Sequence, residues 1–397
     1  MYIKLIHVGT SPPLLSNRVA AFASVPFEST SVFASWTFIA TSSSFRLGQF
    51  TFRGQDPGAN TSGIKKYGNN HDNELTMSTG ENNKLTVLVT GCSDGGLGAA
   101  LALAFHEAGF HVYATARDVA KMGELRAAAG PGIETMPLDV QSSSSIADCV
   151  ARIKRLDILV NNAGTMMTMP MSDVSIPQAK DIFDTNVWGV LAVTQAFLPL
   201  LLDSARRQKG GGIVAVNTSV ASIVPVPFMG VYSASKAAMA MFCDTMRLEL
   251  EVFGLRVVEL KTGAVGPTKL IGNNTSLLAA AAAPTANGGA SGTAAPPILP
   301  EKSIYAPARE VVEGIMRRGH DGTWTPPAKW AKQVVQDLQK KTAPPSKIWR
   351  GQSALLGWLV QFLPAFLVTG PVKRTIKYTQ VEEVLRIARI YPGNDIE

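Results

Sequence analysis

Three side chains near the middle of the chain have the types and the spacing needed to reduce a carbonyl group. Tyr232 and Lys236 are four residues apart, so on a helix they share one face, where an ammonium group can stabilise a phenolate. Ser219 precedes Tyr232 by thirteen residues, where it would close a strand and offer its hydroxyl to a substrate carbonyl. We expect Tyr232 to act as the acid, Lys236 to lower its pKa, and Ser219 to hold the carbonyl oxygen.

A glycine-rich turn must lie close to these side chains if the reduction is to have a hydride donor. Residues 85–90 are a continuous apolar run typical of a buried parallel strand, and residues 97–108 are rich in alanine and leucine, as in a helix. Gly91, Gly96 and Gly98 stand between them. Strand, glycine turn and helix in this order bring backbone amides and a helix N-terminus to a pyrophosphate. The sequence therefore predicts a dinucleotide site.

The second strand, residues 111–117, indicates which dinucleotide is bound. Chains that select NAD tend to end this strand with a carboxylate, which grips the ribose hydroxyls and repels a phosphate. Here Ala116 and Arg117 occupy that end. A guanidinium fits a phosphate with two hydrogen bonds, so we expect NADPH (NADP) as the cofactor. Asp118 is expected to begin the next helix, where an acid suits the helix dipole.

The order of the predicted elements defines the fold class. Further apolar strands are expected at residues 156–160, 212–217 and 255–260, with helical stretches between them. This alternation predicts an α/β fold, a Rossmann-type doubly wound parallel sheet. We expect a single catalytic domain over residues 84–320, with an N-terminal extension over 1–80 and a C-terminal extension over 321–397.

Over about residues 84–318 the chain resembles the short-chain dehydrogenase/reductase family. The resemblance is carried by Thr90-Gly91 with Gly96 and Gly98, Asp139 after Pro137-Leu138, Asn161 to Gly164, Asn186, and the set Ser219, Tyr232 and Lys236. It implies that Asp139 contacts the adenine side, that the 161–164 turn supports the cofactor and the central strand, and that Asn186 holds a water relaying protons to Lys236. Asp139 could instead be a turn residue, since aspartate favours turns.

The predicted site residues fall into two groups. The catalytic residues are Asn186, Ser219, Tyr232 and Lys236. The cofactor-binding residues are Gly91, Ser93, Gly96, Leu97, Gly98, Arg117, Asp139, Asn162, Ala163, Gly164, Tyr232, Lys236, Gly263 and Val265. No metal site is predicted. Taken alone, Lys236 would be a solvated lysine and Tyr232 a half-buried core ring, but the serine and glycine context argues against that interpretation.

Two turns depart from the family pattern. Four residues rather than three separate Gly91 from Gly96, so the phosphate loop is slightly longer, and a glycine fills the extra place. The turn after the sixth strand, residues 262–268, lacks the usual proline-glycine pair and offsets its threonine, so Thr268 is a weaker candidate for a cofactor contact.

The N-terminal extension and an internal insertion have compositions unlike the catalytic domain. Residues 1–80 hold almost no acid before Asp56 and show no sustained period, so we expect them not to pack. A targeting segment and an over-extended gene model that should start at Met77 both remain open. Residues 277–300 are rich in alanine, glycine and proline, and we expect a flexible insertion in the substrate lid, flanked by ordered parts at 269–274 and 304–316.

The C-terminal extension suggests a location. Residues 354–368 are almost wholly apolar, too short to span a bilayer and interrupted by Pro364, with lysines and arginines on both sides. They could lie on a membrane, form a core helix or make a dimer contact. We expect an intracellular protein at the endoplasmic reticulum membrane or the lipid droplet surface, with the cytoplasm as the alternative and the mitochondrion less favoured.

Charge and cysteine content exclude other classes. The net charge of +7 comes without a dense basic stripe, zinc spacing or a stacking platform of aromatic residues, so we predict no nucleic acid partner. Three cysteines without metal-like spacing indicate a reducing compartment.

Substrate class follows from resemblance within the family. Residues 91–117, the helix with Trp188 and residues 224–231 resemble fungal acyl-dihydroxyacetone-phosphate reductases and hydroxysteroid dehydrogenases. We predict NADPH-dependent reduction of a ketone on a lipid-like molecule, with acyl-dihydroxyacetone phosphate as the first candidate. Lys261 or Lys269 is expected near the active-site mouth, where it could bind a substrate phosphate. The alternatives are a hydroxysteroid or retinol-type dehydrogenase, and a catalytically silent cofactor-binding protein at a lipid surface. A homo-oligomer joined through the helices of Asn186 and Tyr232 is also expected.

Overall fold

The computed structural model describes part of the chain. The chain forms two compact units. The described residues are 19–24, 35–41, 44–47, 84–207, 212–270, 298–318, 324–340 and 344–388. The first unit spans Met1–Met77 and the second Ser78–Glu397.

The first unit contains a small antiparallel sheet. Its strands β1 (Val19–Ser24), β2 (Ser35–Thr41) and β3 (Ser44–Leu47) pair in the order β1-β2-β3. These three segments pair as strands, and the expectation that residues 1–80 do not pack stays a prediction. The period-two pattern of β2, with Trp36, Phe38 and Ala40 alternating with other residues, is typical of a strand but too short to stand out in the whole extension.

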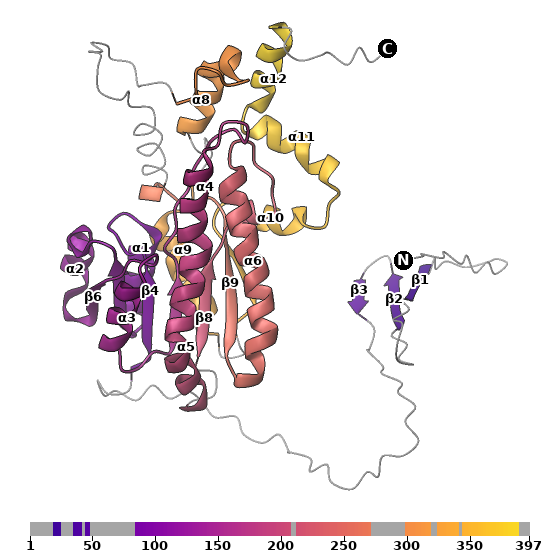
Figure 1. The fold of residues 1–397 in the computed structure, drawn as a ribbon. Coiled ribbons are helices and arrows are strands. Elements are labelled where there is room, and N and C mark those ends of the chain that lie inside the picture. Colours follow the sequence, from indigo (N-terminus) through magenta and orange to yellow (C-terminus); the bar gives the residue numbers. More distant parts are fainter. Residues whose placement is uncertain are drawn as a thin grey trace, which may run out of the picture. The chain divides into compact units, whose positions relative to one another are not determined.

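The second unit is built on a seven-stranded sheet in which every pairing is parallel (Figure 1). The strands run in the order β10-β9-β8-β7-β4-β5-β6 across the sheet. Their bounds are β4 Thr86–Thr90, β5 His111–Ala116, β6 Ile133–Pro137, β7 Ile158–Asn161, β8 Ile213–Asn217, β9 Arg256–Thr262 and β10 Lys347–Arg350. Strands β4, β5 and β6 are added toward one edge of the sheet, and β7 to β10 are added on the other side of β4 toward the opposite edge. In sheets of this kind, ligands bind in the crevice at the carboxyl ends of the two strands where the order reverses, here β4 and β7.

Helices cover both faces of this sheet. The α-helices of the described residues are α1 Leu97–Glu107, α2 Gly123–Ala129, α3 Ser143–Arg152, α4 Ile176–Phe183, α5 Gly189–Arg207, α6 Gly230–Leu250, α8 Arg309–Arg318, α9 Pro327–Leu338, α10 Ala354–Val360, α11 Ala365–Thr375 and α12 Tyr378–Ile387. Of these, α8, α11 and α12 lie beyond the end of the sheet rather than on its faces (Figure 1). Side chains alternate along each strand, so Val87 and Val89 join one core with α1 and α9, while Leu88 joins another with α3, α5 and α6. Burial on both faces explains why the strands are continuous apolar runs.

The C-terminal boundary of the catalytic domain lies later than we expected. Strand β10 pairs with β9 at the sheet edge, and Trp330 of α9 is fully buried in the core beside α1. The stretch after residue 320 is therefore partly integral to the Rossmann domain. The predicted insertion at 277–300 lies, apart from residues 298–300, outside the described residues, as do residues 271–274 of the predicted lid flank.

One helix in the described part of the chain is long and apolar enough to cross a membrane by length and composition alone. It is the continuous helix Ile176–Arg207, formed by α4, a π-helical turn and α5. Its residues Val193, Phe197 and Leu201 are fully buried against the sheet. Such packing is what a core helix of a Rossmann domain needs.

Candidate active site

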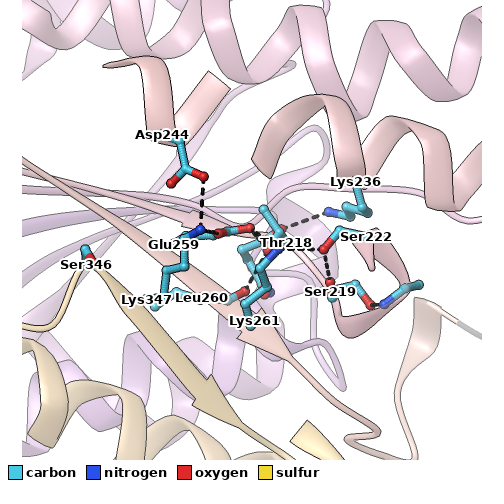
Figure 2. Close-up of polar contacts among 12 residues, drawn as sticks. Thr218, Ser219, Ser222, Lys236, Asp244, Glu259, Leu260, Lys261, Ser346 and Lys347 are labelled. Atoms are coloured by element: carbon cyan, nitrogen blue, oxygen red, sulfur yellow. Dashed lines mark hydrogen bonds and ion pairs between the residues drawn. The ribbon is translucent and has the colours of Figure 1, made fainter. Parts of the chain in front are cut away.

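Helix α6 and the end of β8 bring the three predicted catalytic side chains together. Tyr232 and Lys236 lie one turn apart near the start of α6, and both are buried at 7% exposure. The Lys236 Nζ (Figure 2) donates a 2.8 Å hydrogen bond to the Asn217 carbonyl at the end of β8. The Ser219 side chain hydrogen-bonds to Tyr232. The Ser219 Oγ also accepts a bond from the Ala221 amide at 3.1 Å, which orients the hydroxyl.

Burial controls the pKa of both titratable members of the set. It raises the pKa of Tyr232 above its usual value, and the hydrogen bond with Ser219 lowers it. Burial also lowers the pKa of Lys236 to about 8. The Lys236 ammonium bonds to the Asn217 carbonyl and lies 5.9 Å from the centre of the Tyr232 ring. That Lys236 lowers the Tyr232 pKa during the reaction stays a prediction.

Asn186 lies in a π-helical turn, Asp184–Trp188, between α4 and α5. Its Oδ1 accepts from the Thr165 amide at 2.8 Å, and its Nδ2 donates to the Thr165 carbonyl at 2.9 Å and to the Ser235 Oγ at 3.0 Å. A π-turn widens the helix locally, and such turns are frequent at functional sites. A Cβ on Gly164 would lie 3.2 Å from the Asn186 Oδ1 and 3.5 Å from the Lys236 Nζ. Asn186, Gly164 and Lys236 therefore meet in one place.

Polar side chains join the carboxyl ends of four strands. The Oγ1 of Thr90, the last residue of β4, accepts from the amides of Asn162 and Ala163, both at 2.9 Å. The Asn162 Oδ1 accepts from the Asn217 Nδ2 at 2.9 Å, and the Asn217 Oδ1 accepts from the Thr262 Oγ1 at 2.6 Å. These bonds fix the strand ends against one another, so the site has a rigid floor.

The glycine turn is packed so closely that larger residues would not fit. Gly91 has φ of +73°, and a Cβ there would come within 2.8 Å of the Ala163 Cα. A Cβ on Gly98 would collide with the Gly91 carbonyl, and a Cβ on Gly96 would lie 2.9 Å from the Ser93 carbonyl. Helix α1 begins at Leu97, directly after the turn. A pyrophosphate fits this arrangement, because backbone amides and a helix N-terminus are presented without side-chain obstruction.

The end of β5 lies beside the glycine turn. The Cys92 amide in the turn donates to the Thr115 carbonyl of β5 at 2.8 Å. Arg117 follows the strand, is exposed, and has no side-chain hydrogen bond or ion pair within the described residues. Asp118 caps the next helical turn by accepting from the Ala120 amide at 2.9 Å. The guanidinium at this rim is therefore available to a ligand, and Asp118 has the helix-starting position that we expected.

The remaining predicted cofactor residues lie at the same edge of the sheet. Asp139, after β6, accepts from the Gln141 amide at 3.0 Å, so it forms the turn that was the alternative interpretation. Gly263 donates its amide to the Arg350 carbonyl at 2.9 Å, and Val265 is buried. No geometry of the described residues tests whether these three contact a cofactor.

Lys261 was wrongly expected near the mouth of the site. Its side chain is 2% exposed and pairs with the Glu259 carboxylate at 2.7 Å beneath the Ser219 loop. The alternation of strand β9 explains this, because Lys261 and Glu259 point to the same covered face. Lys269 is exposed and packs its stem against Gly95 of the glycine turn.

Sequence reasoning missed several residues that build the site. Thr90, Asn217 and Ser235 hold the strand ends and Asn186, yet each was treated only as part of a motif. For Thr90 and Asn217 the signal was present, since polar residues at the ends of buried strands must find hydrogen-bond partners. The bonds that join Thr90 to Asn162, Asn217 to Asn162 and Thr262, and Ser235 to Asn186 span 45 to 72 residues of sequence, which no local pattern reveals.

The fold and the site together define a dehydrogenase/reductase that uses a dinucleotide. A bound nicotinamide supplies or accepts a hydride. The geometry is consistent with the predicted roles, in which Ser219 would hold a carbonyl oxygen, Tyr232 would offer a proton to that oxygen, and Lys236 would place a cation beside them. Burial of Tyr232 and Lys236 strengthens these interactions because bulk water is largely excluded.

The chain belongs to the short-chain dehydrogenase/reductase family and is an oxidoreductase. The family profile described as short chain dehydrogenase matches residues 85–277. A short-chain dehydrogenase/reductase of Pestalotiopsis microspora is 46% identical over 306 residues, covering 77% of this chain and 98% of the relative. The NADPH-dependent 1-acyldihydroxyacetone phosphate reductase of Schizosaccharomyces pombe is 33% identical, covering 73% of this chain and 94% of the relative.

A solved structure agrees with the assignment. A short-chain dehydrogenase from Streptomyces avermitilis is similar with a TM-score of 0.54 and 26% identity, covering 77% of this chain and 98% of that one. A serine dehydrogenase complexed with NADP+ has a TM-score of 0.52 at 22% identity, covering 67% of this chain and 94% of that one, and shows the shared fold. Members of the family use nicotinamide cofactors, and the glycine turn fits one.

Proposed function

We propose that this chain is an NADPH-dependent reductase of a ketone on a lipid-like molecule, with acyl-dihydroxyacetone phosphate as the first candidate substrate. The observation that carries the proposal is the apolar surrounding of Tyr232. Tyr232 is buried in a cluster with Met166 and Ala221, and Met229 and Leu270 pack against this cluster. Methionine side chains adapt to irregular apolar shapes, so this surrounding suits an alkyl chain beside the reacting carbonyl.

The preference for NADPH rests on Arg117. Its exposed guanidinium at the end of β5 has no side-chain partner within the described residues, and the nearby carboxylate of Asp118 is occupied in capping. A ribose phosphate would receive two charge-assisted hydrogen bonds from this group. The Schizosaccharomyces pombe relative is named as NADPH-dependent, which supports the same choice.

Helices α10 and α11 support a contact with a lipid surface. The side of α10 that faces the protein carries Ala354 and Gly357, and Gly357 sits against Val220 in the loop after Ser219. The large apolar side chains point outward with exposures between 40% and 76%: Leu355, Leu356, Trp358, Leu359, Phe362, Leu363, Phe366 and Leu367. An ordinary surface helix buries its large apolar side chains and exposes its polar ones, whereas these helices expose the large apolar side chains. Exposed apolar patches of this kind mark interaction sites.

Charge favours an anionic lipid surface as the partner of this apolar face. The chain from Gln339 to Val381 contains no aspartate or glutamate. The same stretch holds seven basic residues, Lys340, Lys341, Lys347, Arg350, Lys373, Arg374 and Lys377. An exposed apolar surface with basic flanks binds bilayers by burial and by attraction to lipid head groups. The proposed location is therefore the endoplasmic reticulum membrane or the lipid droplet surface.

A second copy of the chain is the partner that we propose for the outer face of α5 and α6. Trp188, Met241, Leu248 and Phe253 are more than half exposed on or beside these helices, and the Trp188 and Phe242 rings are 6.3 Å apart. A shallow pocket of about 420 Å³ lies next to Trp188, lined by Ile176 and Phe183 among others. It is far more open than a catalytic pocket needs to be, and it fits a protein contact better.

The experiment that tests the proposed function measures cofactor oxidation by the purified chain. NADPH and NADH are each offered with acyl-dihydroxyacetone phosphate, with a panel of keto-steroids and with retinal. Turnover with NADPH on the phosphorylated lipid is expected. Turnover restricted to steroids or retinal would move the substrate to the alternative class, and cofactor binding without turnover on any ketone would support the silent, cofactor-binding alternative.

A further inference from the structure

Two charged side chains are buried beneath the loop that carries Ser219. Glu259 and Lys261 occupy alternate positions of β9, with side chains 0% and 2% exposed, and their Oε1 and Nζ atoms are 2.7 Å apart (Figure 2). Neither is part of the set that reduces the carbonyl. A buried charge pair is costly, and replacing it with apolar residues of similar size is often neutral or stabilising. Stability alone therefore gives little reason for this pair.

The pair holds the chain on both sides of the catalytic serine. Before it, the Thr218 Oγ1 donates to the Glu259 Oε1 at 2.7 Å. After it, the Lys261 Nζ donates to the Ser222 Oγ at 2.7 Å, and the Ser222 Oγ donates to the Ser219 carbonyl at 2.6 Å. Figure 2 shows this chain of contacts running from Glu259 to Ser219. These side-chain bonds add to two backbone bonds of the same loop, in which the Thr218 amide donates to the Leu260 carbonyl of β9 and the Ser222 amide donates to the Ser219 carbonyl, both at 3.0 Å.

The same pair is connected through Lys347 to helix α6, which carries Tyr232. The Glu259 Oε2 has no hydrogen-bond partner among the described residues, and the Lys347 Nζ lies 4.0 Å from it. The Lys347 Nζ also donates to the Asp244 Oδ2 of α6 at 2.9 Å. One network therefore touches the serine loop, strand β10 and the helix of the catalytic tyrosine.

We propose that Glu259 and Lys261 are positioning residues that set the placement of Ser219 relative to Tyr232. The Ser219 hydroxyl must meet both Tyr232 and the substrate oxygen, and a misplacement of about 1 Å at such a group costs on the order of 100-fold in rate. Charge-assisted bonds are short and directional, so they limit movement of the loop more than apolar packing would.

The test compares two ways of cutting the network with a matched control. The double variant Glu259→Gln, Lys261→Met removes both charges together, so neither is left buried and unpaired. Ser222→Ala leaves the charge pair intact and removes the two bonds of the Ser222 hydroxyl, one from the Lys261 Nζ and one to the Ser219 carbonyl. The control is Asp157→Asn, a carboxylate 1% exposed at the opposite end of the sheet that accepts from Thr86 and Ser204.

The readouts separate positioning from folding. For the double variant and for Ser222→Ala we expect kcat to fall by about 10-fold to 100-fold, while the Kd for NADPH, measured by its fluorescence, stays within about twofold of wild type. The control is expected to lower Tm without lowering kcat. Wild-type kcat in both network variants would overturn the proposal, as would a loss of kcat that follows Tm in all three proteins.

A readout without substrate keeps the proposal separate from the choice of ketone. Crystal structures of both network variants are expected to show the Ser219 carbonyl displaced by roughly 1 Å, with α6 unchanged. An unmoved Ser219 would overturn the positioning role even if the enzyme reduces none of the ketones offered. Failure of every ketone together with a displaced Ser219 would count against the proposed substrate alone.

Discussion

The carboxyl edge of the sheet and the helices α10 and α11 distribute polarity in opposite ways. At the sheet edge, Asn186, Lys236 and Lys261 are buried polar or charged groups. On α10 and α11, Trp358 and Phe366 are exposed apolar groups. Each region reverses the usual rule that apolar side chains lie inside and polar ones outside. Neither arrangement increases the stability of a chain folded in water. We therefore expect each region to bind a partner other than the chain itself.

The comparison also shows how the two regions differ in their tolerance to change. The polar centre is a network in which each bond depends on its neighbours, because an unpaired buried group is costly. The apolar face consists of side chains that make few contacts within the chain, so each can be replaced at little cost in stability.

The largest effect is expected in the polar centre from Tyr232→Phe. This change removes the proton donor and leaves the ring, so turnover should fall about 10³-fold or more. The Kd for NADPH should stay within about twofold, because Lys236 and the glycine turn are intact. Steady-state oxidation of NADPH measures the first quantity, and fluorescence titration the second. Retained turnover would remove Tyr232 from its role as the acid.

The next largest effect is expected on the apolar face. Replacing Trp358, Phe362 and Phe366 together with serine should weaken binding to anionic vesicles by about 100-fold, since each aromatic group contributes on the order of 1–2 kcal/mol when buried in the interface. The free energy of unfolding should change by less than about 1 kcal/mol. Co-sedimentation with phosphatidylserine vesicles measures the binding. The same result from the control pair Ile176→Ser and Ile304→Ser would show that the binding is not specific to α10 and α11.

An intermediate effect is expected at the rim of the polar centre from Arg117→Ser. Loss of a charge-assisted bond to the ribose phosphate should reduce the ratio of NADPH to NADH affinity by about 10-fold or more. The affinity for NADH should barely change. Parallel titrations with the two cofactors give the ratio, and Arg126→Ser, an exposed cation on α2, is the matched control. An unchanged ratio would assign the preference to another group.

The smallest effect is expected from pH. Burial lowers the pKa of Lys236 to about 8, so its ammonium is present below that pH and is lost as pH rises through it. NADPH affinity should therefore weaken several-fold between about pH 7 and 9.5. Titration of the Tyr232→Phe variant over this range isolates the lysine, because the tyrosine no longer contributes. A constant Kd would mean that the charge of Lys236 does not assist cofactor binding.

Local sequence patterns predicted the parts of this protein that are themselves local. Strand, glycine turn and helix at Gly91 to Gly98, and the pairing of Tyr232 with Lys236 on one helix, follow from spacing alone. Strand β10 was missed because it has only four residues, of which the first and last are basic. Its place in the sheet depends on pairing with β9, about ninety residues earlier.

The burial of Lys261 could not be predicted for a related reason. A lysine in a strand is ordinarily at the edge or solvated, and only the positions of Glu259 and Ser222 around Lys261 provide it with partners. The exposure of residues 354–368 was likewise undecided from sequence, because an apolar run fits a core helix as well as a surface. The structure distinguishes a core helix from a surface helix, because α10 turns only the small residues Ala354 and Gly357 toward the protein and leaves its large apolar side chains exposed.

The bonds among Thr90, Asn162, Asn217 and Thr262 have a consequence for how the enzyme matures. They join residues that are 72, 55 and 45 positions apart in the chain. Contacts between such distant segments form late, after the intervening loops have closed. In a newly made chain the catalytic side chains are therefore all present before they are brought together in one site. The onset of activity during refolding would report that the last strands have joined the sheet.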